Sequence, residues 1–129
     1  MHDIEMCFNM NILFVDDKPT MRQLYRLGLK RLGHHVSTAG GGSEAIQAVR
    51  GENFDMIIMD LDMPNMSGWE AVRRIRAMPH GKTVSIVIFT AKHLVLSPDQ
   101  IHQSGADGVL NKPLTPKELL SNVSQMASR

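Results

Sequence analysis

The chain has 129 residues, with 14 Lys plus Arg against 13 Asp plus Glu, and one cysteine. This length fits a single ordinary domain. Because the charges nearly balance, no field for binding a polyanion is predicted, and we expect no direct nucleic-acid partner. Cys7 has no second cysteine with which to form an internal disulfide, which fits a reducing compartment.

Neither a membrane span nor a signal peptide is predicted. No apolar run approaches the ~20 residues that cross a bilayer, and residues 1–10 lack the basic-then-apolar order of a secretory leader. We therefore expect a cytoplasmic protein with no membrane partner. Residues 1–10 are interpreted as an N-terminal extension and residues 11–129 as the single domain.

Five short apolar segments predict strands. Residues 12–15, 56–59 and 86–89 are continuously apolar, which is typical of strands buried on both faces. Residues 109–110 form a shorter run of the same kind. Residues 36–39 alternate between apolar and polar side chains, as expected of a strand at the edge of a sheet.

The segments between these strands carry apolar residues at helical spacing. The repeating positions are Met21, Leu24, Gly28 and Leu32, then Ala45, Ile46 and Val49, then Val72 and Ile75, and finally Leu119, Leu120, Val123 and Ala127. Two helix starts, at Ser97 and Thr115, each combine a capping hydroxyl, a following proline and a Gln or Glu three residues on. Gly33, Gly51 and Gly105 predict helix ends. The helix over residues 98–104 has only Ile101 as a strong apolar anchor, so we expect it to be loosely held.

Five strands, each followed by a helix, predict an α/β fold of the (βα)₅ type. Right-handed crossovers make such a chain a doubly wound parallel sheet with helices on both faces. In an open parallel sheet, ligands bind beyond the carboxyl ends of the strands. The residues that end each strand are therefore the candidates for a functional site.

Polar side chains end four of the predicted strands. Asp16 and Asp17 end the first strand, Asp60 the third and Thr90 the fourth, while the fifth runs into Lys112. A single aspartate at such a place is more often a solvated loop residue, but three carboxylates at one edge repel each other unless a cation is present. Oxygen ligands with an open position favour Mg²⁺.

This set of groups fits phosphoryl transfer. A carboxylate can act as the nucleophile and form an aspartyl-phosphate. Mg²⁺, the Lys112 ammonium and the Thr90 hydroxyl, together with a nearby backbone N–H, would then neutralise the charge on the phosphoryl oxygens. The bond between Lys112 and Pro113 is a candidate for the cis form, which would aim the ammonium inward.

From about Asn11 to Ser128 the sequence resembles the receiver domains of two-component signalling. The stretches that carry the resemblance are LFVDD at residues 13–17, MDLDMP at residues 59–64 with Gly68 after it, IFTA at residues 88–91, and GAD at residues 105–107 through the Lys-Pro pair at residues 112–113. Each stretch alone is weak evidence, whereas all four in this order are highly specific. The resemblance implies a flavodoxin-like sheet with strand order 2-1-3-4-5.

The resemblance also implies a role for each site residue. Asp60 would be the phosphoacceptor, and Asp17 and Asp60 would ligate Mg²⁺, or Mn²⁺ in its place, through their side chains. Asp62 would contribute its backbone carbonyl, and Asp16 would act largely through water. Thr90 and Lys112 match the family's hydroxyl and lysine.

The partners follow from the same resemblance. The phosphoryl donor is expected to be a phosphohistidine on a sensor histidine kinase or a phosphotransfer protein, and the output protein or domain is unknown. The chain is not expected to be an enzyme beyond its own phosphorylation and dephosphorylation. Both a stand-alone regulator and a receiver excised from a hybrid kinase remain open.

Two positions bear on switching and phosphate lifetime. Receivers commonly carry Tyr or Phe three residues before the lysine, where this chain has Val109, so we hypothesise a weaker or altered switch. Asp62 and Lys92 stand two residues after the acceptor and two after Thr90. They either attract each other across the mouth of the site or are two solvated side chains whose interaction is worth ~0–1 kcal/mol.

The sequence allows two alternative interpretations. The Asp60-Leu61-Asp62 triplet resembles the nucleophile motif of haloacid-dehalogenase-type phosphatases, but in that family this strand comes first, whereas here Asp16 and Asp17 precede it. A degenerate receiver that serves only as a binding scaffold is the second alternative.

Among the remaining features, the methionines Met56, Met59 and Met63 are predicted to fill the core, and the six histidines to occupy surface or turn positions.

Overall fold

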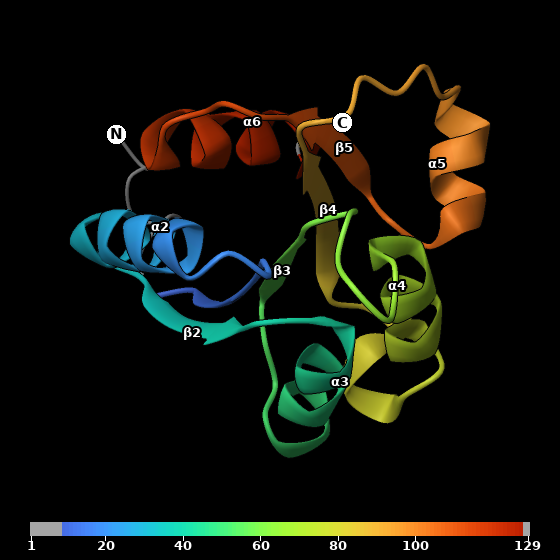
Figure 1. Ribbon diagram of the computed structural model, residues 1–129, viewed down its shortest axis with the longest axis horizontal. Coiled ribbons are helices and arrows are strands. Elements are labelled where there is room, and N and C mark those ends of the chain that lie inside the picture. The colour runs from blue at the N-terminus through green and yellow to red at the C-terminus, as the bar shows by residue number, and fades with distance from the viewer. Residues whose placement is uncertain (1–8, 128–129) are drawn as a thin grey trace.

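A computed structural model describes residues 9–127. Within this range, five parallel strands form one sheet in the order β2-β1-β3-β4-β5, which confirms the predicted topology (Figure 1). The alternating strand is at an edge, as its pattern predicted. The strands are β1 (Asn11–Val15), β2 (His35–Ala39), β3 (Met56–Met59), β4 (Ser85–Thr90) and β5 (Gly108–Asn111).

Helices cover both faces of the sheet. Figure 1 shows α2 and α6 on one side of the strands, and α3 and α4 on the other, with α5 beyond α4. Their bounds are α2 (Pro19–Arg31), α3 (Gly42–Gly51), α4 (Gly68–Arg76), α5 (Pro98–Ser104) and α6 (Pro116–Ala127), with a short 3₁₀ turn, η1 (Pro79–Gly81), before β4. None of the helices described here has the length and apolar character of a membrane span.

Successive strand residues point to opposite faces and divide the core into two layers. Leu13, Ile57 and Ile86 face α3 and α4, where they meet Val49 and Ile75. The layer on the opposite face holds Phe14, Ile58 and Phe89 with residues of α2 and α6. Because the inner strands are buried on both sides, their backbones are held rigidly, and so are the residues that follow their carboxyl ends.

Most of the predicted helix signals are confirmed. Ser97 and Gln100 form a reciprocal capping box at α5, and Thr115 makes the matching pair of bonds with Glu118. Met56 and Met59 are buried, as expected of core residues. No residue of α5 is buried, and Ile101 is only partly buried, which agrees with a loosely held helix.

The buried face of α2 differs from the predicted one. The structure buries Tyr25 and Leu29, whereas Leu24 is 55% exposed. The other three positions of the predicted stripe are only partly buried. The inward face is therefore centred about one residue later than the aliphatic spacing suggested, because the tyrosine ring belongs to the core.

The three glycines predicted to end helices are confirmed. Gly51 is the last residue of α3, and Gly33 and Gly105 adopt left-handed backbone angles at the ends of α2 and α5. One prediction about a histidine is wrong. His34 is buried rather than exposed at a turn. Its Nδ1 accepts the Met10 N–H at 3.3 Å, and burial lowers the pKa of its imidazole. This side chain therefore lies beside the start of β1.

Candidate functional site

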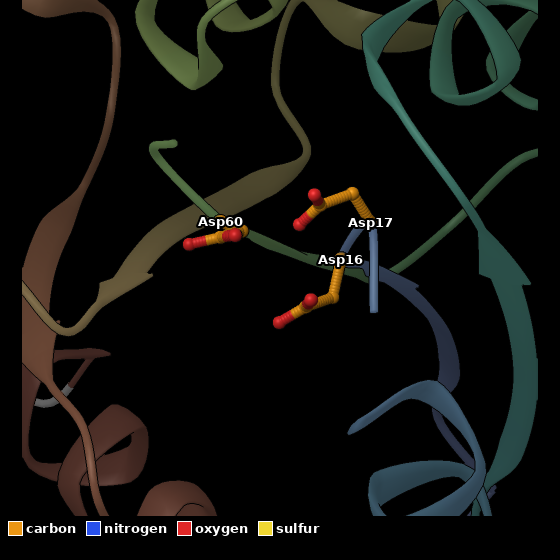
Figure 2. A group of neighbouring side chains, drawn as sticks. All are labelled: Asp16, Asp17 and Asp60. Carbon is orange, nitrogen blue, oxygen red and sulfur yellow. The ribbon is translucent and has the colours of Figure 1, made fainter. Parts of the chain in front are cut away.

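Three carboxylates converge at the carboxyl ends of β1 and β3. Asp16 and Asp17 follow β1 directly, and Asp60 follows β3. The Asp16 N–H donates to Ala39 O at 3.1 Å and the Asp60 N–H to Val15 O at 3.0 Å, so the strand ladder fixes both backbones. One carboxylate oxygen from each aspartate lies within 4.8 Å of the others, and Figure 2 shows the three groups together.

Lys112 brings the positive charge to this cluster. Its Nζ lies 2.7 Å from Asp16 Oδ2 and 3.6 Å from Asp60 Oδ1, and its side chain is only 13% exposed. Asp16 and Asp60 are themselves buried. A mostly buried ammonium between two buried carboxylates balances part of their charge, and the Lys112–Pro113 bond that follows is cis, as the sequence suggested.

Asp17 supplies evidence that the cluster is suited to a cation. Its Oδ1 is buried and has no hydrogen-bond donor in the described part of the chain, although Lys18 Nζ lies 3.7 Å away. A buried carboxylate oxygen without a hydrogen bond carries a cost that a metal ion would remove. Three carboxylates within reach of one ion, all offering oxygen, fit the ligand preference of Mg²⁺.

The Thr90 hydroxyl belongs to the same edge of the sheet. Thr90 ends β4 and is buried, and its Oγ1 accepts the Lys92 N–H at 3.1 Å. Lys92 Nζ in turn lies 3.3 Å from Asp62 Oδ1, with both side chains more than half exposed. Of the two alternatives left open for Asp62 and Lys92, the structure shows an ion pair, and both of its side chains are largely solvated. The Asp62 backbone carbonyl as a metal ligand stays a prediction.

Burial raises the pKa of the Asp60 carboxyl, with the Lys112 ammonium opposing the rise and the Asp16 carboxylate adding to it. The folded chain therefore holds this proton more tightly than the unfolded chain, and stability is lost as pH rises through the raised pKa.

In metal-free protein, Asp60→Asn should increase the free energy of unfolding at pH 7 by about 1 kcal/mol. Urea denaturation in a chelator, repeated near pH 4, should show the gain shrinking in acid.

The exposed Asp62 provides the control for this measurement, since Asp62→Asn should change the free energy of unfolding by less than about 0.5 kcal/mol. An Asp60→Asn variant that is less stable than the parent at pH 7 would contradict the assigned cost of the buried charge.

Sequence reasoning missed several residues that support the site. Arg22 donates to the Asp16 backbone carbonyl at 2.7 Å, and the ring of Phe89 lies beneath the Lys112 ammonium. Gly68 lets α4 begin against the acceptor, because a Cβ there would come 2.3 Å from Asp60 O. Gly68 and Phe89 belonged to recognised stretches, but neither had been assigned a role at the site. An arginine six residues after Asp16 and an aromatic residue before Thr90 carry no spacing signal of their own.

The comparison with known proteins agrees with this geometry. A family model described as the response regulator receiver domain matches residues 12–124. The chain belongs to this family and is a receiver domain of two-component signalling.

Individual relatives come from both kinases and regulators. The chain is 35% identical to the sensor histidine kinase RcsC of Salmonella typhi over 94% of its own length, but it spans only 13% of that kinase. The chemotaxis protein CheY4 of Vibrio cholerae superposes with a TM-score of 0.84 at 32% identity, covering 92% of this chain and 98% of CheY4. The receiver domain of the kinase PA1611 from Pseudomonas aeruginosa, which has a magnesium ion in its active-site cleft, gives 0.80 at 29% identity, covering 94% and 99%.

Proposed function

We propose that Asp60 accepts a phosphoryl group in the presence of Mg²⁺ and that Asp16, Asp17, Thr90 and Lys112 make this transfer possible. The observation that carries the proposal is the convergence of three carboxylates on a mostly buried lysine ammonium, with one buried carboxylate oxygen that accepts no hydrogen bond. Within the described range, no other group of three or more His, Cys, Asp or Glu side chains brings its ligand atoms within 4.8 Å of one another.

In the proposed transfer, one Asp60 carboxylate oxygen attacks the phosphorus of a phosphohistidine on a sensor histidine kinase or phosphotransfer protein. A phosphorus–oxygen bond forms, the phosphorus–nitrogen bond breaks, and its electron pair stays on the imidazole. Asp17 and Asp60, with the Asp62 carbonyl, would hold Mg²⁺, which supplies neutralising charge when bound. Lys112 and the Thr90 hydroxyl would then contact the remaining phosphoryl oxygens.

The wider role is part of the same proposal. Mn²⁺ would substitute for Mg²⁺, since both accept carboxylate oxygens. The chain would act in the cytoplasm on an output protein or domain without contacting nucleic acid, and the only reactions it would catalyse are its own phosphorylation and dephosphorylation. Val109, which lines a groove of about 540 Å³ between α5, β5 and α6, would give a weaker or altered switch.

The function is tested by incubating the protein with Mg²⁺ and phosphoramidate, a small phosphodonor, and weighing the intact chain. We expect one phosphoryl group per chain, located at position 60 by reduction of the acyl phosphate, and none in Asp60→Asn. Asp62→Asn, which removes the neighbouring carboxylate on the same loop, should still be labelled. Labelling that survives in Asp60→Asn would refute the assignment of the acceptor.

The same experiment separates the alternatives. A phosphatase would turn over phosphate monoesters repeatedly instead of stopping at one group per chain. A degenerate receiver would remain unlabelled and would not bind beryllofluoride in the presence of Mg²⁺. The signalling function is favoured over a phosphatase and over a degenerate receiver because every acidic, hydroxyl and lysine position of the site is present, namely Asp16, Asp17, Asp60, Thr90 and Lys112.

The Asp62–Lys92 ion pair is proposed to restrain the mouth of the site. Because both side chains are largely exposed, the pair contributes at most about 1 kcal/mol, so Lys92→Ala should change the half-life of the aspartyl-phosphate by about two- to fivefold. The half-life is measured after removal of the donor. An identical half-life in the parent and in Lys92→Ala would show that the pair does not regulate phosphate loss.

A further inference from the structure

An aromatic cluster connects α2 with the lysine of the site. Tyr25 stacks on Phe14, with ring centroids 4.9 Å apart, and meets Phe89 edge-on at 5.4 Å. The Phe89 ring in turn lies under the Lys112 ammonium, 5.5 Å from Nζ to the centroid. Tyr25 therefore supports the apolar surface on which the Lys112 side chain rests.

The Tyr25 hydroxyl makes a second contact with the same segment. It donates a hydrogen bond to the carbonyl of Leu114, two residues after Lys112. One turn further along α2, Gly28 accommodates the Pro116 ring, since a Cβ at Gly28 would come 2.3 Å from Pro116 Cγ. Thus α2 holds the segment that follows β5 at two successive points of one helix face.

The position of the Lys112 ammonium depends on this segment. The Lys112 N–H donates to Thr90 O at 2.8 Å, which fixes the residue on its β4 side. On its other side the backbone continues to Leu114, whose carbonyl is held by Tyr25. Burial raises the pKa of the Tyr25 phenol, so the hydroxyl stays protonated and able to donate at neutral pH. A phenylalanine would keep the rings and lose this bond.

We propose that Tyr25 is a positioning residue, which holds the Lys112 ammonium where it meets the phosphoryl group at Asp60. The inference rests on the proposed function, because the position of the ammonium matters to catalysis only if Asp60 is phosphorylated. The simpler view, that Tyr25 is an ordinary core residue, makes a different prediction for the variants below.

The test compares Tyr25→Phe with Leu29→Val in the full chain. Leu29 lies on the same helix, faces the same apolar layer and is fully buried, so its truncation perturbs packing without removing the bond to Leu114. The first readout is the ¹H–¹⁵N signal of the Lys112 ammonium in metal-free protein, identified by its absence in Lys112→Arg. The second readout is the initial rate of labelling by phosphoramidate, and the Mg²⁺ affinity of each variant is measured as well.

In Tyr25→Phe we expect hydrogen exchange of the Lys112 ammonium to be at least about fivefold faster. The labelling rate should fall about 3–10-fold, with the Mg²⁺ affinity unchanged within about twofold. Leu29→Val should leave the ammonium signal and the labelling rate as they are in the parent. An unchanged ammonium signal in Tyr25→Phe, or equal effects in the two variants, would overturn the proposal.

The ammonium signal is read without Mg²⁺ and without a phosphodonor. A parent protein that takes no phosphoryl group would therefore refute the proposed function, and the ammonium signal would still decide whether Tyr25 positions Lys112. The two failures are distinguishable.

Discussion

Replacing Lys112 by alanine is expected to change two properties of the carboxylate site in opposite directions. Mg²⁺ should bind on the order of tenfold more tightly, because the ammonium 2.7 Å from Asp16 and 3.6 Å from Asp60 no longer repels the incoming cation. Phosphorylation of Asp60 should slow by about 10²–10³-fold, because a preorganised positive charge for the phosphoryl oxygens is lost.

The two effects are measured separately. Trp69, at the start of α4 and partly buried against the core, serves as a fluorescence reporter for a Mg²⁺ titration, and the labelling rate is taken at saturating Mg²⁺. Lys18→Ala is the matched control, since Lys18 Nζ lies 3.7 Å from Asp17 on a side chain that is 62% exposed. It should change either quantity by less than about twofold. If Mg²⁺ affinity and rate both fell in Lys112→Ala, Lys112 would instead be maintaining the shape of the site.

Arg76→Ala is expected to lower the free energy of unfolding by about 3 kcal/mol. The guanidinium donates to the carbonyls of Gly105, Gly81 and Val84 at 2.8, 3.0 and 2.6 Å, and to Asp107 Oδ2 at 3.1 Å. It ties the end of α4 to the segments that enter β4 and β5. Truncation leaves several partly buried carbonyls without a donor, and that loss is the main cost.

Arg73 on the same helix provides the comparison. It contacts Glu70 at 2.6 Å and is 72% exposed, so Arg73→Ala should cost less than about 0.5 kcal/mol in the same urea denaturation series. Because Arg76 lies at the amino ends of β4 and β5, opposite the carboxylates, the folded variant should keep its Mg²⁺ affinity. Equal losses of stability in the two variants would show that the Arg76 network adds nothing beyond a surface ion pair.

The sheet and most of the site could be predicted because they depend on short-range patterns. Continuous apolar runs identify strands buried on both faces, and parallel strands bring their carboxyl ends to one edge. The strand order that the family resemblance implied then placed Asp16, Asp17, Asp60, Thr90 and Lys112 on neighbouring strands. The structure adds the distances between these groups and the absence of a hydrogen bond to the buried Oδ1 of Asp17.

The missing parts depend on contacts between distant segments. Leu24 fits the helical spacing of α2 as well as Tyr25 does, and only the aromatic neighbours Phe14 and Phe89 decide that the tyrosine turns inward. His34 is buried where its Nδ1 accepts the N–H of Met10, which is 24 residues away in the chain. Likewise, no local signal marks Arg76 as the donor to four backbone carbonyls outside α4.

A crystal structure with Mg²⁺ and beryllofluoride, an analogue of the phosphoryl group, tests the central claim most directly. We predict beryllium bonded to an Asp60 carboxylate oxygen, one Mg²⁺ in contact with Asp17 and Asp60, and the Lys112 ammonium and Thr90 hydroxyl on the fluorine atoms. Beryllofluoride on another carboxylate, a cation out of reach of Asp17, or a Lys112 side chain turned away from the analogue would contradict the assignment.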